Sequence, residues 1–311
     1  MSAYEELELV ASDNVRLVSV TLGLSAYTEA PLSSAGPGLL AIYEKFLSHI
    51  DKSELRFYAT ENMRSHKPVS KSTFTMLPSW LKAGAPQREY VSLEIKDGAQ
   101  HQDASHLKFQ VHGFEIKSKL FQKGRGNAIS LNLPASGTSA DHDVLKELFI
   151  QTCSVMPIRS GIAGLVMECS RYDATASETH AWATGMRMRG LDICRIPLDC
   201  QAVGVDGLKG VGWLTALGHT LLEQLGGIER LRQGWPSDIS LIETPHGVVI
   251  QAGQQPQLGD VNRPDTLALY RAVYKKVAGL IEIAGKRSMS FNLDEDYVQR
   301  TEQWFMRLGD A

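Results

Sequence analysis

Three consecutive segments between residues 89 and 134 alternate apolar and polar side chains, and this feature most restricts the fold. They read EYVSLEIKDG, LKFQVHGFEIK and NAISLNLP. Alternation is typical of strands with one buried face, and strands this close in sequence pair most simply as an antiparallel meander with one wet face. In the second segment the apolar parity changes at Gly113, where we expect a β-bulge.

The other segments mix strands and helices without a strict strand–helix–strand repeat. The nearly continuous apolar run GIAGLVMEC suits a buried central strand, and helical spacing of apolar residues predicts helices over 36–50, 140–156 and 211–227. We therefore expect an α+β fold with mixed or antiparallel sheets and packed helices. The chain reads as one domain over residues 1–311. Residues 1–157 and residues 158–311 each show the order strand, helix, further strands and a final helix. The alternative that the domain consists of two similar α/β halves therefore stays open.

Charge and composition exclude several classes of protein. The net charge is −3, whereas a nucleic-acid binder usually carries a basic surplus. No apolar run approaches the roughly 20 residues of a membrane span, and the acidic N-terminal segment does not resemble a secretory signal. The four cysteines have no metal-site spacing and are too few for a disulfide scaffold. We expect a cytoplasmic protein with no membrane or nucleic-acid partner.

The strongest enzymatic candidate is the pair Glu94 and Lys96 in the segment LEIK. Glu-x-Lys on a strand is half of a nuclease signature, in which the acid holds a metal and the lysine steadies the attacking water. The alternative is that the two residues are merely alternate positions on the wet face of a strand, as are Glu115 and Lys117. We favour this second interpretation and keep a metal-dependent nuclease or hydrolase as the alternative function.

No other segment predicts a catalytic, cofactor or metal site. The histidines and the aspartate in HQDASHLKFQVH match no metal spacing, and the glycines before Trp213 lack the Lys-Ser/Thr of a phosphate-binding loop. We therefore expect no cofactor, no metal and no catalytic residue.

The segment LGDVNR at 258–263 is explained by local turn chemistry. Gly259 permits a tight turn, and Asp260 and Asn262 can bond the neighbouring backbone. Arg263 can pair with a nearby acid and fix the loop to the body of the protein. None of these roles requires catalysis.

This turn is also part of an ordered series of motifs. The series comprises GLLAIYEKFL, LRFYAT, MLPSWLKAGAP, MPIRSGIAGLVME, RGLDI, LKGVGWLTALG and AGQQPQLGDVNR. It resembles the type VI secretion immunity family, long catalogued as a domain of unknown function, from about residue 38 to residue 276. Residues 118–140 match nothing in that pattern.

The resemblance implies a bacterial antidote that binds a cognate type VI effector toxin in a stoichiometric complex. Some members accompany toxins similar to restriction-type nucleases, so the expected partner is a nuclease domain. An adaptor that binds an effector without neutralising it remains a further alternative. The shared residues are expected to be structural: Gly259, Asp260, Asn262, Arg263 and Trp213.

For the partner interface, the acidic run Asp294, Glu295 and Asp296 is the preferred sequence candidate, with Trp304 as an apolar anchor. Acids here would complement the basic groups that a nuclease presents to DNA. The competing explanation is that acids at a helix start only cap the helix and complement its dipole, and this explanation is the stronger one.

Overall fold

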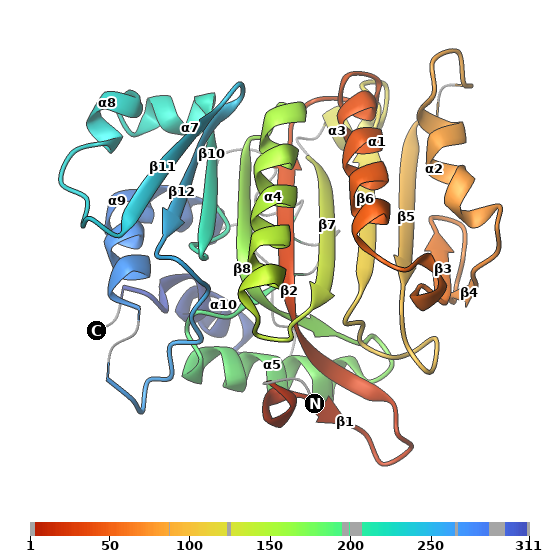
Figure 1. Cartoon of the computed structure of the whole chain (residues 1–311), viewed down its shortest axis with the longest axis horizontal. Coiled ribbons are helices and arrows are strands. Elements are labelled where there is room, and N and C mark those ends of the chain that lie inside the picture. Colours follow the sequence, from red (N-terminus) through yellow and green to blue (C-terminus); the bar gives the residue numbers. More distant parts are fainter. Residues whose placement is uncertain are drawn as a thin grey trace.

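One large sheet crosses the molecule (Figure 1). The computed structural model describes residues 4–86, 88–122, 126–194, 199, 207–264, 267–285 and 296–309. Their twelve strands follow the order β11-β12-β10-β8-β2-β7-β6-β5-β3-β4, with β1 paired to β2 and β9 paired to β8. All pairings are antiparallel except β8 with β9. The predicted α+β class is confirmed.

The strands have the following bounds: β1 Leu9–Val10, β2 Arg16–Thr28, β3 Phe57–Thr60, β4 Lys67–Pro68, β5 Tyr90–Lys96, β6 Lys108–Phe114, β7 Asn127–Pro134, β8 Ser160–Cys169, β9 Asp192–Ile193, β10 Leu214–Gly218, β11 Ile239–Thr244 and β12 Gly247–Ala252. The α-helices are α1 Leu32–His49, α2 Thr73–Leu81, α3 Lys119–Gln122, α4 Ser139–Val155, α5 Ala174–Arg187, α7 His219–Gln224, α8 Gly227–Leu231, α9 Ala268–Gly285 and α10 Tyr297–Met306. Short 3₁₀ turns occur at Glu5–Leu7 and Lys52–Glu54.

The long central strands β2 and β8 join the two halves of the chain. They pair antiparallel from Val18 opposite Cys169 to Tyr27 opposite Ser160. On the other side of β2 the strands β7, β6 and β5 form the predicted meander. The sheet is therefore continuous across the boundary near residue 157.

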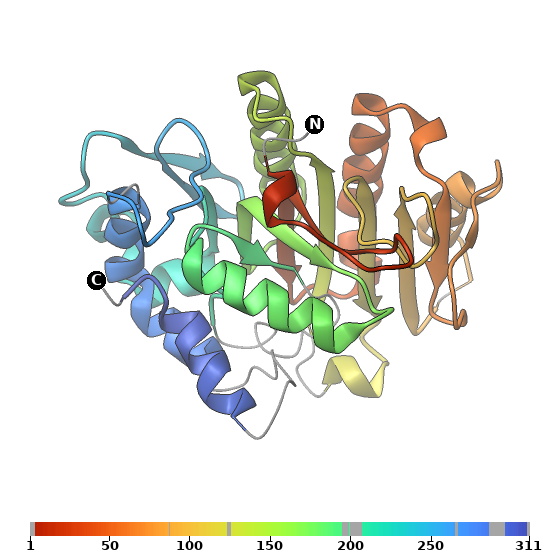
Figure 2. The same cartoon turned by 90° about the horizontal axis from the view of Figure 1, so that it is seen from below.

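Helices cover the two faces of the sheet unequally (Figures 1 and 2). On one face, α1 packs against β6 and α4 packs against β2, β8 and the strands beyond them. The ring centroids of Tyr43 and Phe46 on α1 lie 4.8 and 5.6 Å from that of Phe109 on β6. On the other face, α5 crosses β2 and β8, and α9 packs on β12. Burial of these apolar faces is the main stabilising contribution.

Two local expectations are wrong. Residues 211–227 do not form one helix, because Leu214–Gly218 is strand β10 between β8 and β12, and the helix α7 begins only at His219. Gly113 is not at a bulge, because β5 and β6 pair without a shift from Lys96 to Tyr90. The parity change instead marks the end of β6 at Phe114.

None of the described helices combines the length and the apolar character that crossing a bilayer requires.

Candidate functional site

Strands β5 and β6 have one apolar and one polar face, and the polar face lines a pocket. Leu93, Ile95, Phe109 and Val111 are buried in the main core under α1. The alternate positions carry Ser92, Glu94 and Lys96 on β5, and Lys108, Gln110 and His112 on β6. In the register of the pair, Glu94 is opposite Gln110 and Lys96 is opposite Lys108, so these side chains share one face.

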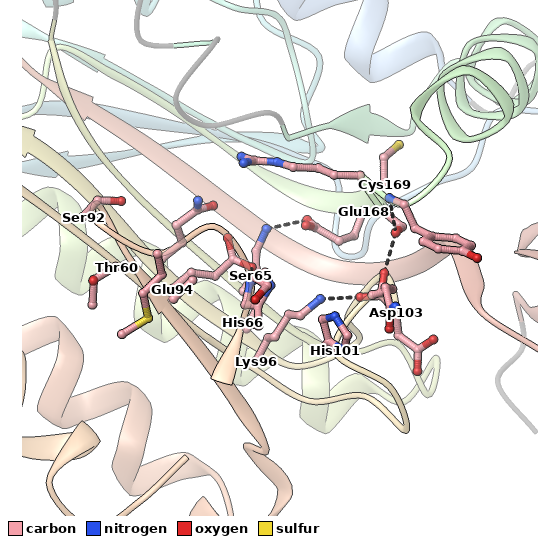
Figure 3. A pocket seen from close by; sticks show the side chains of 18 of the residues that line it. Thr60, Ser65, His66, Ser92, Glu94, Lys96, His101, Asp103, Glu168 and Cys169 are labelled. Carbon is pink, nitrogen blue, oxygen red and sulfur yellow. Dashed lines mark hydrogen bonds and ion pairs between the residues drawn. The ribbon is translucent and has the colours of Figure 1, made fainter. Parts of the chain in front are cut away.

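The pocket is a cavity of about 700 Å³ beside this polar face. Its walls come from the segment after β3, from residues 101–103, from the end of β8 and from the start of α5, as Figure 3 shows from close by. The pocket is therefore built by segments from both halves of the chain. Its volume matches that of ordinary binding pockets, although its lining is more polar than usual.

A buried ion pair lies at the floor of the pocket. The Nζ of Lys108 is 2.5 Å from Oε2 of Glu168 on β8, and Nδ2 of Asn132 donates to the same oxygen at 3.2 Å. Burial would lower the pKa of Lys108, but the nearby acidic groups, of which Glu168 contributes most, together raise that pKa. The contact therefore fixes two side chains from different strands.

A second polar contact ties the segment after β3 to the floor. Nε2 of His66 lies 2.7 Å from Oε1 of Glu94. Burial would raise the pKa of Glu94, but the contact with His66 and the nearby lysines 108 and 96 hold that pKa well below its usual range. Glu94 is thus an ionised carboxylate whose position is fixed by its neighbours.

Lys96 is held differently. Its Nζ donates to the backbone carbonyl of Asp103 at 2.5 Å, and its side chain is almost completely buried. Burial lowers the pKa of Lys96. Figure 3 shows Lys96 reaching towards Asp103 beside the pair formed by Glu94 and His66.

An aromatic side chain stands at the mouth of the pocket. Tyr172 is 53% exposed, and its hydroxyl donates to Oδ2 of Asp13 at 2.9 Å in the turn between β1 and β2. The exposed Arg64 and Arg171 also border the pocket. Exposed tyrosine and arginine side chains are frequent anchors of protein interfaces, so this rim is suited to a protein partner.

The structure brings the predicted pair Glu94 and Lys96 into this pocket. Among the described residues, no cluster of histidine, cysteine and acidic side chains is suited to holding a metal ion. The expectation of a wet face is wrong for Lys96, which is 6% exposed. It is also wrong for Glu115, whose carboxylate accepts from the backbone and hydroxyl of Ser33 at the start of α1.

The acidic run predicted as an interface is only partly described. Asp294 and Glu295 lie outside the described residues, and Asp296 is exposed at the N-cap of α10 without a capping side-chain bond. The expected anchor Trp304 is 2% exposed and lies in the core beneath Arg307, whose guanidinium carbon is 3.8 Å from the ring centroid. The prediction of an exposed anchor is therefore wrong for Trp304. It is a core residue, because the face of α10 that carries it packs against α5.

The turn at 258–263 is fixed to the end of α5. Gly259 has a φ of +69°, which suits glycine. Arg187 donates to Asp260 through Nε at 3.3 Å and through a terminal nitrogen at 2.9 Å, and the backbone amide of Asn262 donates to the same carboxylate. Together these hydrogen bonds lower the pKa of Asp260 to about 2. Arg263 lies 3.8 Å from Asp260 within the same turn, so Arg187 rather than Arg263 joins the turn to the body.

Trp213, the other expected structural residue, is 1% exposed and donates through Nε1 to the carbonyl of Gly253 at 2.9 Å. The sequence analysis did not identify Lys108, His66 or Tyr172 as site residues. Lys108 could have been found, because it is a polar position in the alternating pattern of a strand that pairs with the strand of Lys96. His66 and Tyr172 lie in irregular segments, and no periodic pattern predicts that these segments lie beside the sheet.

One comparison with known proteins identifies the family of this chain, and another shows a similar fold. Residues 39–308 match the family model described as TsiV, type VI immunity for VRR-NUC. The fold is similar to that of the T6SS protein PA0821 of Pseudomonas aeruginosa, with a TM-score of 0.79 and 21% sequence identity over 98% of this chain and 88% of that one. A search of curated proteins found no match.

Proposed function

The chain belongs to the family of type VI immunity proteins for VRR-NUC nucleases, and we propose that it holds its effector inactive through the pocket beside β5 and β6. The family assignment makes it an immunity protein against a VRR-NUC nuclease effector, and an inhibitor rather than an enzyme. The mode of inhibition and the location of the interface are the proposal.

An inhibitor of this kind acts by stoichiometric binding without turnover. Even a small free fraction of a nuclease damages DNA, so the complex needs nanomolar affinity or better, equivalent to about 12 kcal/mol. Such affinity usually requires roughly 1,600 Å² of interface and a few buried anchors. A concave surface with fixed side chains meets this requirement well, because little conformational entropy is lost when the partner docks.

The observation that carries the proposal is the pocket on the polar face of β5 and β6. Polar side chains in the middle of a sheet are costly to bury without partners, and here they line a cavity open to a ligand. The Lys108–Glu168 and Glu94–His66 contacts hold the floor in one arrangement, and Tyr172 offers apolar area at the mouth. A protruding polar loop of the nuclease is the partner structure that fits this shape.

The acidic run Asp294, Glu295 and Asp296 remains a second proposed contact, supported by the exposure of Asp296. The turn residues Gly259 to Arg263 and Trp213 are proposed to stabilise the scaffold, in view of their contacts with α5 and β12. We also propose a cytoplasmic location and one immunity domain over residues 1–311, the latter because β2 and β8 join both halves in one sheet.

Filling the pocket tests the proposal. Ser92 lines it and is half-buried, so Ser92→Trp should place an indole in the space of the docking loop. We expect affinity for the nuclease, measured by calorimetry, to fall at least tenfold, and growth protection during co-expression to fall with it. The matched control is Ser79→Trp on the exposed side of α2.

The wild-type chain should abolish DNA cleavage at one equivalent of nuclease. Inhibition only in large excess would argue against a stoichiometric antidote. If Ser92→Trp folds and binds like the wild type, the interface lies elsewhere on the molecule.

A further inference from the structure

Among the described residues, three lysines are buried beside the sheet, and they differ in how their charge is neutralised. Lys209 meets two carboxylates, with Nζ 2.9 Å from Oδ2 of Asp192 and 2.8 Å from Oδ2 of Asp199, and it also donates to the carbonyl of Ile193. Its three donor positions therefore have three acceptors, two of them charged. Burial would lower the pKa of Lys209, but these carboxylates raise it above its usual range.

Lys108 and Lys96 lie opposite each other on β6 and β5, yet only Lys108 has a carboxylate partner, Glu168. Lys96 is 6% exposed and donates only to the carbonyl of Asp103, and it forms no ion pair within the part of the chain that the structure describes. A carbonyl dipole does not neutralise an ammonium group, and two of the three donor positions of Lys96 remain unused.

The carboxylates nearest to Lys96 are already engaged. Glu94 contacts His66, and Glu168 accepts from Lys108 and Asn132. The carboxylate of Asp103 accepts from three backbone amides, those of residues 16, 99 and 100. A carboxylate in direct contact with Lys96 would therefore come from outside the chain, because Glu94 and Glu168 act on it only from beyond ion-pair distance, and the pocket beside it provides the route.

We propose that Lys96 receives the carboxylate of an aspartate or glutamate from the bound nuclease. This inference rests on the proposed function and assigns Lys96 the role of a specificity residue at the pocket floor. A protein carboxylate fits better than a free small anion, because a cavity of about 700 Å³ has room for a whole loop. The exposed ring of Tyr172 at the mouth would contact that loop outside the ion pair.

Lys96→Met separates this role from a structural one. It removes a buried charge that has no direct ion pair among the described residues and keeps an apolar chain of similar length, so the melting temperature of the free protein should change little. Affinity for the nuclease should fall 10- to 100-fold, because the partner's carboxylate would then be buried without a counter-ion. Lys67→Met, at an exposed lysine on β4, is the matched control and should change neither quantity.

A double-mutant cycle identifies the partner residue. Each acidic residue of the nuclease is changed to its amide, and the affinities are measured against wild type and Lys96→Met. One amide substitution in the nuclease should weaken binding to the wild-type chain. The same substitution should not weaken binding to Lys96→Met, because the ion pair is already lost there. If Lys96→Met does not fold, Lys96→Gln, which keeps a hydrogen-bond donor, gives the same readings.

Unchanged affinity of a folded Lys96 variant would overturn this inference, while the proposed function would stand if the wild type still neutralises the nuclease. A fall in melting temperature without a loss of affinity would also overturn it, since it would make Lys96 purely structural. A sulfate- or acetate-dependent rise in melting temperature that vanishes in Lys96→Met, with no effect on nuclease binding, would assign the site to a free anion instead.

Discussion

The two ends of the sheet differ in how their faces are covered. Towards β11, β8 has α4 on one face and α5 on the other, and β12 has α4 and α9. Towards β3, the apolar face of β5 and β6 lies under α1, whereas the polar face lines the pocket. We infer that the enclosed end stabilises the fold and that the open end is left incomplete for a partner.

Buried charge follows the same division. At the enclosed end, Lys209 is surrounded by two carboxylates, and the hydroxyl of Tyr27 donates to one of them, Asp199, at 3.2 Å. At the open end, no carboxylate of the described residues lies within ion-pair distance of Lys96, and Glu94 and Glu168 act on it only from further away. A lysine that already contacts two carboxylates gains no stability from a further anion. A buried lysine without a direct ion pair is stabilised when a bound partner supplies a carboxylate.

The largest expected effect comes from removing the charge at the enclosed end. Lys209→Met would leave Asp192 and Asp199 facing each other without a cation, which should cost about 3–5 kcal/mol of unfolding free energy. Denaturant unfolding monitored by circular dichroism measures this loss. Lys275→Met on the exposed surface of α9 is the control. Stability close to that of the wild type would remove the proposed difference between the two ends.

At the open end, a substitution should affect binding and leave folding alone. Tyr172→Ala removes an exposed ring at the mouth of the pocket and should cost about 2 kcal/mol of binding free energy, roughly 30-fold in affinity. Unfolding free energy should change by less than about 0.5 kcal/mol, as for most surface substitutions. Tyr172→Phe keeps the ring and loses only the bond to Asp13, so it should bind almost normally. Equal affinity of all three proteins by calorimetry would place the interface outside the rim.

The turn that joins the enclosed end to α5 should give a smaller effect on stability alone. Gly259→Ala forces a non-glycine residue to a φ of +69°, and its Cβ would overlap the side chain of Leu267. We expect a loss of about 1–2 kcal/mol in unfolding free energy and normal affinity for the nuclease. Gly84→Ala, also at positive φ but with open space around it, separates backbone strain from the overlap. A binding defect at full stability would give the turn a direct part in recognition.

These variants also mark what the sequence could predict. The meander of β5, β6 and β7 was predictable, because a period of two is a local property of each segment. The residues 214–218 were misassigned, because Leu214 and Leu217 fit a helical stripe as well as a strand buried between β8 and β12. Periodicity cannot separate these cases when both faces of an element are apolar.

The site was predictable only where one strand carries it. Glu94 and Lys96 were recognised from a single segment, but their partners His66 and Asp103 lie in loops. Long-range pairing likewise explains why the sequence indicated only Arg263 as the residue that fixes the turn, since Arg187 is 73 residues from Asp260. The position of Trp304 in the apolar stripe of its helix predicts that it packs against an apolar surface. The same pattern does not distinguish a surface of this chain from a surface of a partner.

The smallest expected effect is a pH dependence confined to the pocket floor. The contact with His66 holds the pKa of Glu94 well below the usual 4.5, so the folded state keeps this carboxylate ionised where the unfolded chain is already protonated. A depressed carboxylate pKa contributes stability that is complete above about pH 4.5 and is lost as the pH falls towards the folded pKa. Glu94→Gln removes that dependence, so stability between pH 4.5 and pH 3 should fall less steeply than in the wild type, by up to about 1.4 kcal/mol per pH unit. Glu44→Gln on the exposed side of α1 should leave the slope unchanged. Equal slopes in wild type and Glu94→Gln would mean that His66 does not hold Glu94 ionised, and the floor of the open end would then be less rigid than the comparison requires.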